Sequence, residues 1–64
     1  MTIKILRMPE VEEQTGLKKS SIYAAIEEGK FPAPINLGAR AVGWLESEIN
    51  EWLEARILAS RGEI

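Results

Sequence analysis

The sequence predicts a small, mainly α-helical domain with one β-hairpin, in the winged helix-turn-helix class. Two short helical stretches are joined by a turn at Gly16, two β-prone stretches follow a proline-containing connector, and an amphipathic helix comes last. A chain of 64 residues has room for one domain. We therefore expect residues 1–64 to form a single domain, with the helix-turn-helix at about 9–28, the wing at about 35–44 and the final helix at about 46–59.

The first helix is predicted from about Pro9 to Thr15. Proline has a fixed φ and no backbone N–H, so it suits the first turn of a helix, and the glutamates that follow it suit the positive end of the helix dipole. Gly16 supplies the left-handed backbone conformation that ends the helix and turns the chain. Before this helix, residues 2–6 alternate weakly between polar and apolar and predict either an extended arm or an edge strand.

The second helix is predicted from about Lys18 to Glu28, with Gly29 as its C-terminal stop. At about 100° per residue, its apolar side chains gather on one face and leave the opposite face for a partner. The apolar face holds Ile22, Ala25, Ile26 and Gly29, the opposite face holds Ser20, Ala24 and Glu27, and Tyr23 and Ser21 lie on the flanks. Lys18 is the expected N-cap residue, and Ser20 or Ser21 would cap a later start.

The segment after the second helix contains two prolines, which bias the residues before them to extended geometry and predict a stiff connector. Phe31 in this connector is expected at the edge of the core. Next come two β-prone pieces, Ile35 to Leu37 and Ala41 to Trp44, separated by three residues that include a glycine. This spacing predicts a β-hairpin, which is a candidate wing, with Arg40 projecting from its tip.

The final helix is predicted from about Glu46 to Ala59, with acidic residues in its first turn and Arg56 near its end, as the helix dipole favours. Its apolar stripe consists of Ile49, Trp52, Leu53 and Ile57. We expect Trp44 and Trp52 to lie in the core rather than to stack on bases. Residues 60–64 are expected to fray.

The composition excludes several classes of site. The chain has no cysteine and no histidine, which removes disulfides, thiol nucleophiles, imidazole bases and the usual soft metal sites. Its 10 carboxylates, without a glycine-rich phosphate loop, predict solvated helix faces, so we expect no enzyme activity, no cofactor and no metal. No apolar run approaches the roughly 18 residues that span a bilayer, and the N-terminal segment lacks a signal-peptide core. We therefore expect a cytoplasmic protein that makes no membrane contact.

The net charge of −2 argues by itself against nucleic-acid binding, which begins with cations at phosphates. The charges are unevenly distributed along the chain. Acidic residues lie on either side of residues 15–21, whereas that stretch carries Lys18, Lys19 and no acid. A basic edge on an acidic body is one interpretation, and an ordinary mixed surface is the other.

In a winged helix-turn-helix, the second helix enters the major groove of double-stranded DNA, about 12 Å wide, and the hairpin reaches the backbone or the minor groove. The candidate DNA-contacting residues are Lys18, Lys19, Ser20, Ser21 and Tyr23 for the groove, and Arg40 with Arg7 or Lys30 for the backbone. Amines suit phosphates or a guanine edge, hydroxyls suit phosphates or bases, and a phenol suits a phosphate or a thymine methyl. Each has a structural alternative: solvated lysines, capping serines, a tyrosine packed against the first helix and an arginine that aids solubility.

Four motifs occur in one order along the chain. They are R-x-P-E-V at Arg7 to Val11, T-G-L-x-x-S-x-I-Y at Thr15 to Tyr23, G-x-F-P at Gly29 to Pro32, and G-W-x-x-x-E-I-x-x-W at Gly43 to Trp52. From about Leu6 to Ile57 the chain resembles the AlpA family of prophage-encoded transcriptional regulators, relatives of the excisionase and MerR-like winged-helix proteins. The resemblance implies a sequence-specific DNA-binding regulator of prophage or mobile-element genes, often acting on an integrase or excisionase gene. Family members often carry Ser or Thr in place of Lys18 and Arg in place of Ala24, which predicts an altered site preference.

Two other functions stay open. Small winged-helix proteins of this kind can act as excisionases that bind and bend attachment-site DNA. The net charge and the acidic final helix also suit a protein-interaction module, such as an anti-repressor or inhibitor. Because so small a chain reads few base pairs, we expect dimers or cooperative neighbours on DNA, with Ile57 and Leu58 as their contact, and RNA polymerase is the other expected partner.

Overall fold

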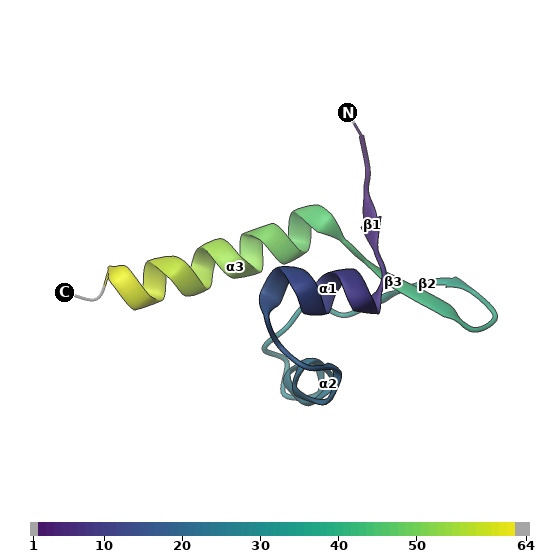
Figure 1. Cartoon of the computed structure of the whole chain (residues 1–64), viewed down its shortest axis with the longest axis horizontal. Helices are drawn as coiled ribbons and strands as arrows, with labels where there is room; N and C mark the ends of the chain where they lie inside the picture. The colour runs from purple at the N-terminus through teal and green to yellow at the C-terminus, as the bar shows by residue number, and fades with distance from the viewer. Residues whose placement is uncertain (1, 63–64) are drawn as a thin grey trace.

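The computed structural model describes residues 2–62. Its elements are β1 (Ile5–Leu6), α1 (Met8–Thr15), α2 (Lys19–Glu27), β2 (Ile35–Gly38), β3 (Ala41–Leu45) and α3 (Glu46–Arg61). Figure 1 shows α1 in the middle of the domain, α2 end-on below it, the β2–β3 hairpin on one side and α3 extending to the other. The prediction of a mainly α-helical winged helix-turn-helix with a small hairpin is confirmed.

Helix α1 begins at Met8, one residue before the predicted start. The Arg7 backbone N–H donates to Glu10 Oε1 at 2.8 Å, and the Glu10 backbone N–H donates to the Arg7 carbonyl at 2.9 Å. These two bonds occupy backbone donors that have no intrahelical partner at a helix start. At the other end, Gly16 adopts φ 75° and its N–H donates to the Glu12 carbonyl, so glycine ends the helix as predicted.

Helix α2 begins at Lys19, and Lys18 is its N-cap residue in extended conformation. No side chain caps this end, because lysine has no acceptor atom for a backbone N–H. The alternative in which Ser20 or Ser21 caps the helix is wrong, since both lie inside its first turn. The helix ends at Glu27, one residue earlier than predicted.

The connector after α2 is tied to both tryptophans. Gly29 adopts φ 73°, the positive φ expected of a glycine that stops a helix. Two tryptophan indoles then donate to carbonyls of the connector: Trp52 Nε1 to Lys30 at 2.7 Å and Trp44 Nε1 to Pro32 at 3.0 Å. Phe31 is 6% exposed, which confirms its predicted place at the core edge.

The strands form a three-stranded antiparallel sheet in the order β1-β3-β2. Leu6 pairs with Trp44, so the N-terminal segment is an edge strand at residues 5–6. The hairpin turn is shorter than the predicted three residues, because Gly38 pairs with Ala41 and leaves two residues in the turn. Asn36 Oδ1 accepts a hydrogen bond from the Gly38 backbone N–H at 3.0 Å, which fixes the entry to this turn.

Gly43 lies where β1 approaches β3. A Cβ added to it would lie 3.0 Å from the Leu6 carbonyl oxygen and would collide with the Ile5 side chain. A backbone oxygen moves aside less easily than a flexible side chain, so a larger residue at this position would push β1 away from β3. The sheet therefore depends on a residue that contributes no side chain to the core.

The core consists of six buried residues: Leu6, Val11, Ile22, Phe31, Trp44 and Ile49. Trp44 is 0% exposed, which confirms its predicted core role. Trp52 packs against this core and is half-buried, with its ring edge-on to Phe31 at 4.8 Å between centroids. Arg56 lies over the Trp52 ring, with its Cζ 5.3 Å from the ring centroid.

The outer half of α3 departs from the prediction. The helix runs to Arg61, so Ser60 and Arg61 are helical rather than frayed, and residues 63–64 lie outside the described residues. Ile57, which belongs to the predicted apolar stripe and was also expected to contact a second copy together with Leu58, is 51% exposed. The reason is that α3 extends beyond the body of the domain, as Figure 1 shows, so no other described element covers this part of the stripe.

Candidate nucleic-acid interface

The start of α2 exposes one continuous set of polar side chains. Residues 18–21 are all exposed, and Tyr23 is 42% exposed. Ile22, in the middle of this set, is 0% exposed and fixes the helix to the core, while Ala25 and Ile26 pack beside it. The predicted division of the helix into an inner and an outer face is therefore confirmed, and Tyr23 is not packed away.

These polar side chains have no partners in the described part of the chain. Across residues 2–62, no ion pair or side-chain hydrogen bond involves the two lysines, the two serines or Tyr23. The first backbone N–H groups of α2 also lack a side-chain cap. Uncapped helix N–H groups and two ammonium groups form a concentration of hydrogen-bond donors and positive charge at one end of the helix.

The opposite end of α2 has the opposite charge. Glu27 shares the outward face with Ser20, and Glu28 follows it as the C-cap residue. Both carboxylates are exposed. A polyanion is therefore attracted to the first turns of α2 and repelled from its last turn.

The turn between α1 and α2 is fixed by Thr15, which was predicted only as the last residue of the first helix. Thr15 Oγ1 donates to the Val11 carbonyl at 2.8 Å and accepts from the Leu17 backbone N–H at 3.2 Å. Leu17 itself packs against the core, so the hydroxyl and the leucine together set the direction in which α2 begins. The sequence feature that could have predicted this role is a threonine directly before a turn glycine.

Arg40 occupies the two-residue turn at the tip of the hairpin and is exposed there, as predicted. In Figure 1 the tip lies well to one side of α2. Arg40 and the lysines of α2 are therefore two separate cationic positions and do not merge into one patch. Two exposed apolar side chains, Leu37 and Val42, lie on the strands behind the tip.

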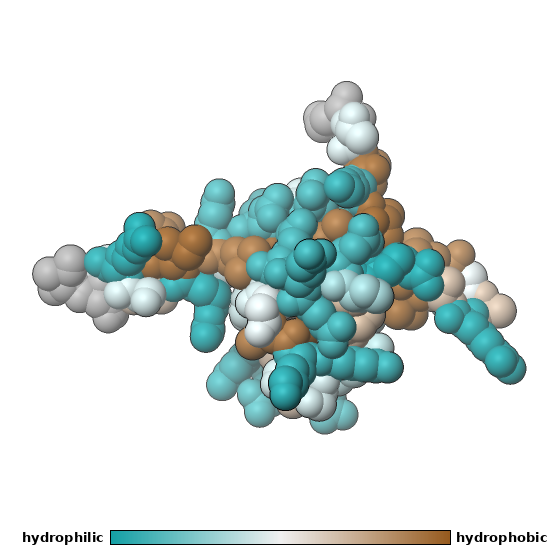
Figure 2. Space-filling view, viewed as in Figure 1, coloured by the Kyte–Doolittle hydropathy of each residue, from teal (hydrophilic) through white to brown (hydrophobic). Residues whose placement is uncertain are grey.

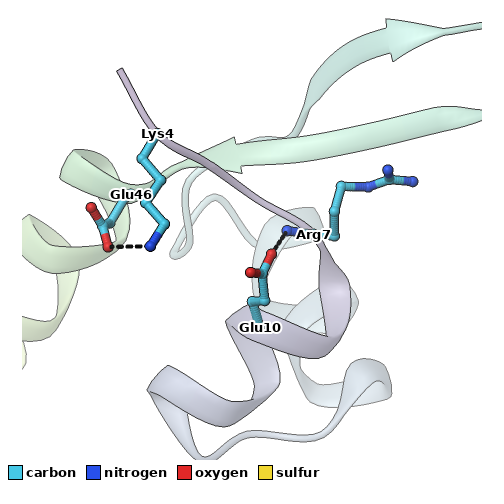
Figure 3. A network of polar contacts seen from close by, with 4 residues as sticks. All are labelled: Lys4, Arg7, Glu10 and Glu46. Carbon is cyan, nitrogen blue, oxygen red and sulfur yellow. Dashed lines mark hydrogen bonds and ion pairs between the residues drawn. The ribbon is translucent and has the colours of Figure 1, made fainter. Parts of the chain in front are cut away.

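The other two candidate cations lie apart from the start of α2 in the chain. Arg7 is the exposed N-cap residue of α1, and Figure 3 shows its guanidinium directed away from Glu10 and from the Lys4–Glu46 ion pair. Lys30 follows the far end of α2, with its Nζ 3.8 Å from Glu28 Oε1. Of the eight candidate residues, the structure groups the five of α2, while Arg7, Lys30 and Arg40 each come from a different element end or connection.

Two other features are absent from the described residues, namely a metal-binding cluster and a helix able to span a membrane. Within residues 2–62, no group of three or more His, Cys, Asp or Glu side chains is placed to hold a metal ion. Across the same range, no helix combines the length and the apolar character needed to cross a bilayer. The surface seen in Figure 2 is hydrophilic over much of α1, with apolar colour around the strands and along parts of α3.

Comparison with known proteins places the chain in a family. Residues 4–57 match the family described as "Prophage CP4-57 regulatory protein (AlpA)". The chain is 44% identical over 54 residues to "Uncharacterized protein ORF88" of Enterobacteria phage P4, covering 84% of this chain and 61% of that longer protein. It is 38% identical over 60 residues to "DNA-binding transcriptional activator AlpA" of Escherichia coli K12, covering 84% of this chain and 86% of that protein. The matched range includes β1, both helices of the helix-turn-helix, the wing and most of α3, and the chain therefore belongs to the AlpA family of prophage regulatory proteins.

Proposed function

We propose that this protein is a sequence-specific DNA-binding transcriptional regulator of a prophage or mobile element, with α2 as the helix that reads the major groove. The observation that carries the proposal is the exposed set of donors and cations at the start of α2, held outward by the buried Ile22. An α-helix fits the major groove, and its N-terminal residues are those that contact base edges in helix-turn-helix proteins. The similarity to the E. coli activator supports the same function.

Within this proposal, some of the candidate residues contact bases and others contact the phosphate backbone. Lys19, Ser20 and Tyr23 meet base edges or adjacent phosphates, and Lys18 meets a phosphate at the helix start. Arg40 contacts the backbone or the minor groove from the tip of the wing, since arginine suits both sites. Arg7 or Lys30 adds a further phosphate contact. Ser21 lies on the flank of α2 and completes the polar set.

Because the net charge is −2, the protein as a whole does not attract DNA, and binding depends on cations placed close to the phosphates. With roughly four cations at phosphates, the logarithm of the affinity should fall by about 3 to 4 for each tenfold rise in salt concentration. Glu27 and Glu28 oppose binding only if α2 enters the groove deeply, so a shallow approach by its first turns is favoured. An affinity that does not change with salt contradicts the proposal.

The proposed target is DNA that controls an integrase or excisionase gene, and the proposed place of action is the bacterial nucleoid in the cytoplasm. RNA polymerase is the expected partner if the protein activates transcription. An excisionase would instead bind and bend attachment-site DNA. The location of the binding site separates these functions: a site at a promoter supports regulation, and a site at the attachment sequence supports excision.

The test is a footprint of the purified protein on DNA flanking its own gene, at two salt concentrations. The variant Lys18→Ala/Lys19→Ala should lose protection, while the matched variant Lys4→Gln/Arg56→Gln, which removes the same charge outside α2, should keep it. If Lys19 reads a base, Lys19→Ala alone should cost about 1 to 3 kcal/mol of binding free energy and relax the sequence specificity. If Lys19 touches only phosphate, the same substitution should weaken binding to all DNA sequences equally. Absence of protection at both salt concentrations overturns the proposal and favours a protein partner.

A further inference from the structure

The outer half of α3 presents large apolar side chains to solvent. From Glu54 onward every described residue of the helix is exposed, including Ile57 at 51% and Leu58 at 69%. In Figure 1 this half extends away from the body, and in Figure 2 the same region carries apolar colour. A shallow hollow lies along it, lined by Leu53, Arg56, Ile57, Ala59, Ser60 and Arg61.

This half of the helix has little to stabilise it within one copy. Helical segments shorter than about 12 residues are marginal in water unless they pack on something. In the part of the chain that the structure describes, the ion pairs are Lys4–Glu46, at the first residue of α3, and Lys30–Glu28, so neither involves the outer half of α3. Packing of Ile57 and Leu58 against a partner would remove apolar surface from water and hold the helix in place.

The charges of α3 indicate the partner. The first half carries Glu46, Glu48, Glu51 and Glu54, and the second half carries Arg56 and Arg61. If a second copy packs its own α3 side by side in the same direction, Glu54 meets Glu54 and Arg61 meets Arg61. If the second helix runs in the opposite direction, glutamate meets arginine. A helix whose two halves have opposite charge is complementary to itself in the antiparallel arrangement.

We propose that two copies of this chain pair in antiparallel fashion through the outer halves of their α3 helices. A two-fold axis between Ile57 and Leu58 places Ile57 beside Leu58 of the second copy and Glu54 beside Arg61 of the second copy. The same contacts occur twice, as two-fold symmetry requires. The acidic first halves then point away from each other and stay in solvent.

The pairing is weak in free solution. The contact covers about eight residues of each helix, or about 12 Å, which buries far less than the roughly 800 Å² per partner of a stable interface. Two copies held on neighbouring DNA sites have an effective concentration in the millimolar range, at which a weak contact becomes useful. This last step depends on the proposed function, but the pairing does not.

The test uses charge reversal at two exposed positions, where we expect little effect on folding. In sedimentation experiments from about 10 μM to 1 mM, the intact chain should associate to a dimer. Glu54→Arg places arginine beside Arg61 of the second copy, and Arg61→Glu places glutamate beside Glu54 of the second copy. Each variant should therefore dimerise about tenfold more weakly. An equimolar mixture of the two variants should form a heterodimer as strong as the original dimer, because both contacts are again between opposite charges.

The controls distinguish this geometry from other contacts. Glu48→Arg changes the same charge on the acidic half of α3 and should leave dimerisation unchanged, whereas Leu58→Asp should abolish it. Circular dichroism checks that every variant stays folded. The proposal is overturned if the intact chain stays monomeric at 1 mM or if the mixed variants fail to associate. Either result leaves the footprint experiment untouched, so the failure of the dimer and the failure of DNA binding are separate outcomes.

Discussion

The seam between β1 and β3 and the first turns of α2 differ in what they can tolerate. At the seam, Leu6 and Trp44 are at most 1% exposed, and Gly43 has no room for a single added carbon. In α2, Lys18 and Lys19 are exposed and touch no other described side chain by ion pair or hydrogen bond. The residues that hold this small domain together are therefore separate from the residues of the proposed interface. Mutations should therefore affect stability or binding, but seldom both.

The largest expected effect on stability comes from removing the buried ring of Trp44, and it is compared with removing the exposed ring of Tyr23. Trp44→Ala removes a fully buried ring and its hydrogen bond to Pro32, and should cost about 3 to 5 kcal/mol of unfolding free energy. Tyr23→Ala removes a ring that is 42% exposed and should cost less than about 1 kcal/mol while weakening DNA binding. Urea denaturation followed by circular dichroism measures the first effect. Equal destabilisation by both substitutions would mean that the exposed Tyr23 ring supports the fold as much as the buried Trp44 ring does.

A second test compares two glycines of the hairpin. Gly43→Ala forces a Cβ against the Leu6 carbonyl and should destabilise the domain by about 1 to 3 kcal/mol. Gly38→Ala adds the same atom where nothing lies within 4 Å, and should change the stability by less than about 1 kcal/mol. Thermal unfolding of both variants gives the difference. If both variants unfold at the same temperature, the lack of space beside Gly43 does not affect the stability of the domain.

The wing should have a smaller effect, on binding alone. Arg40→Ala removes an exposed cation from the turn of the hairpin. We expect weaker binding to all DNA sequences equally and a salt dependence reduced by about one unit per tenfold change in salt. Arg40→Lys keeps the charge and should keep the salt dependence. Titrations at several salt concentrations measure both, and an effect confined to one sequence would instead assign base reading to the wing.

Lys30→Ala should have the smallest effect. Its Nζ lies 3.8 Å from Glu28 in an exposed ion pair, and such pairs contribute about 0 to 1 kcal/mol. The glutamate beside it also offsets its attraction for phosphate. If Arg7 supplies the further phosphate contact, stability and DNA affinity should both stay close to those of the original chain, whereas a loss of affinity as large as that of Arg40→Ala would assign this contact to Lys30.

The features of α2 could be predicted because they arise within a few residues. Gly16 and Gly29 were recognised as helix ends, and both have the positive φ that glycine adopts without strain. The periodicity of the apolar residues assigned Ile22 to the core and Ser20 to the opposite face. The role of Lys18 as N-cap residue also followed from its place after the turn.

The sequence-based predictions that were wrong concern where the strands of the hairpin and the final helix end. A bulge in the hairpin shortened its turn from three residues to two, because the ladder between β2 and β3 includes Gly38. Residues Ser60 and Arg61 remained helical, although nothing in their sequence strongly favours a helix over a frayed end. Hydrogen bonding between neighbours decides such boundaries, and residue preferences alone are too weak to do so.

By itself, the sequence determined the helix-turn-helix, the cationic start of α2 and the position of Arg40 at a hairpin tip, because turn geometry and helical periodicity act over short distances in the chain. Only the tertiary structure decided that Leu6 pairs with Trp44, that Gly43 lies close against the Ile5 side chain and the Leu6 carbonyl, and that Ile57 lies beyond the body. A strand of two residues has almost no local preference, so its place depends on a partner strand far along the chain. Likewise, an apolar stripe shows which face of a helix packs, but the length of the neighbouring elements decides how much of that face is covered.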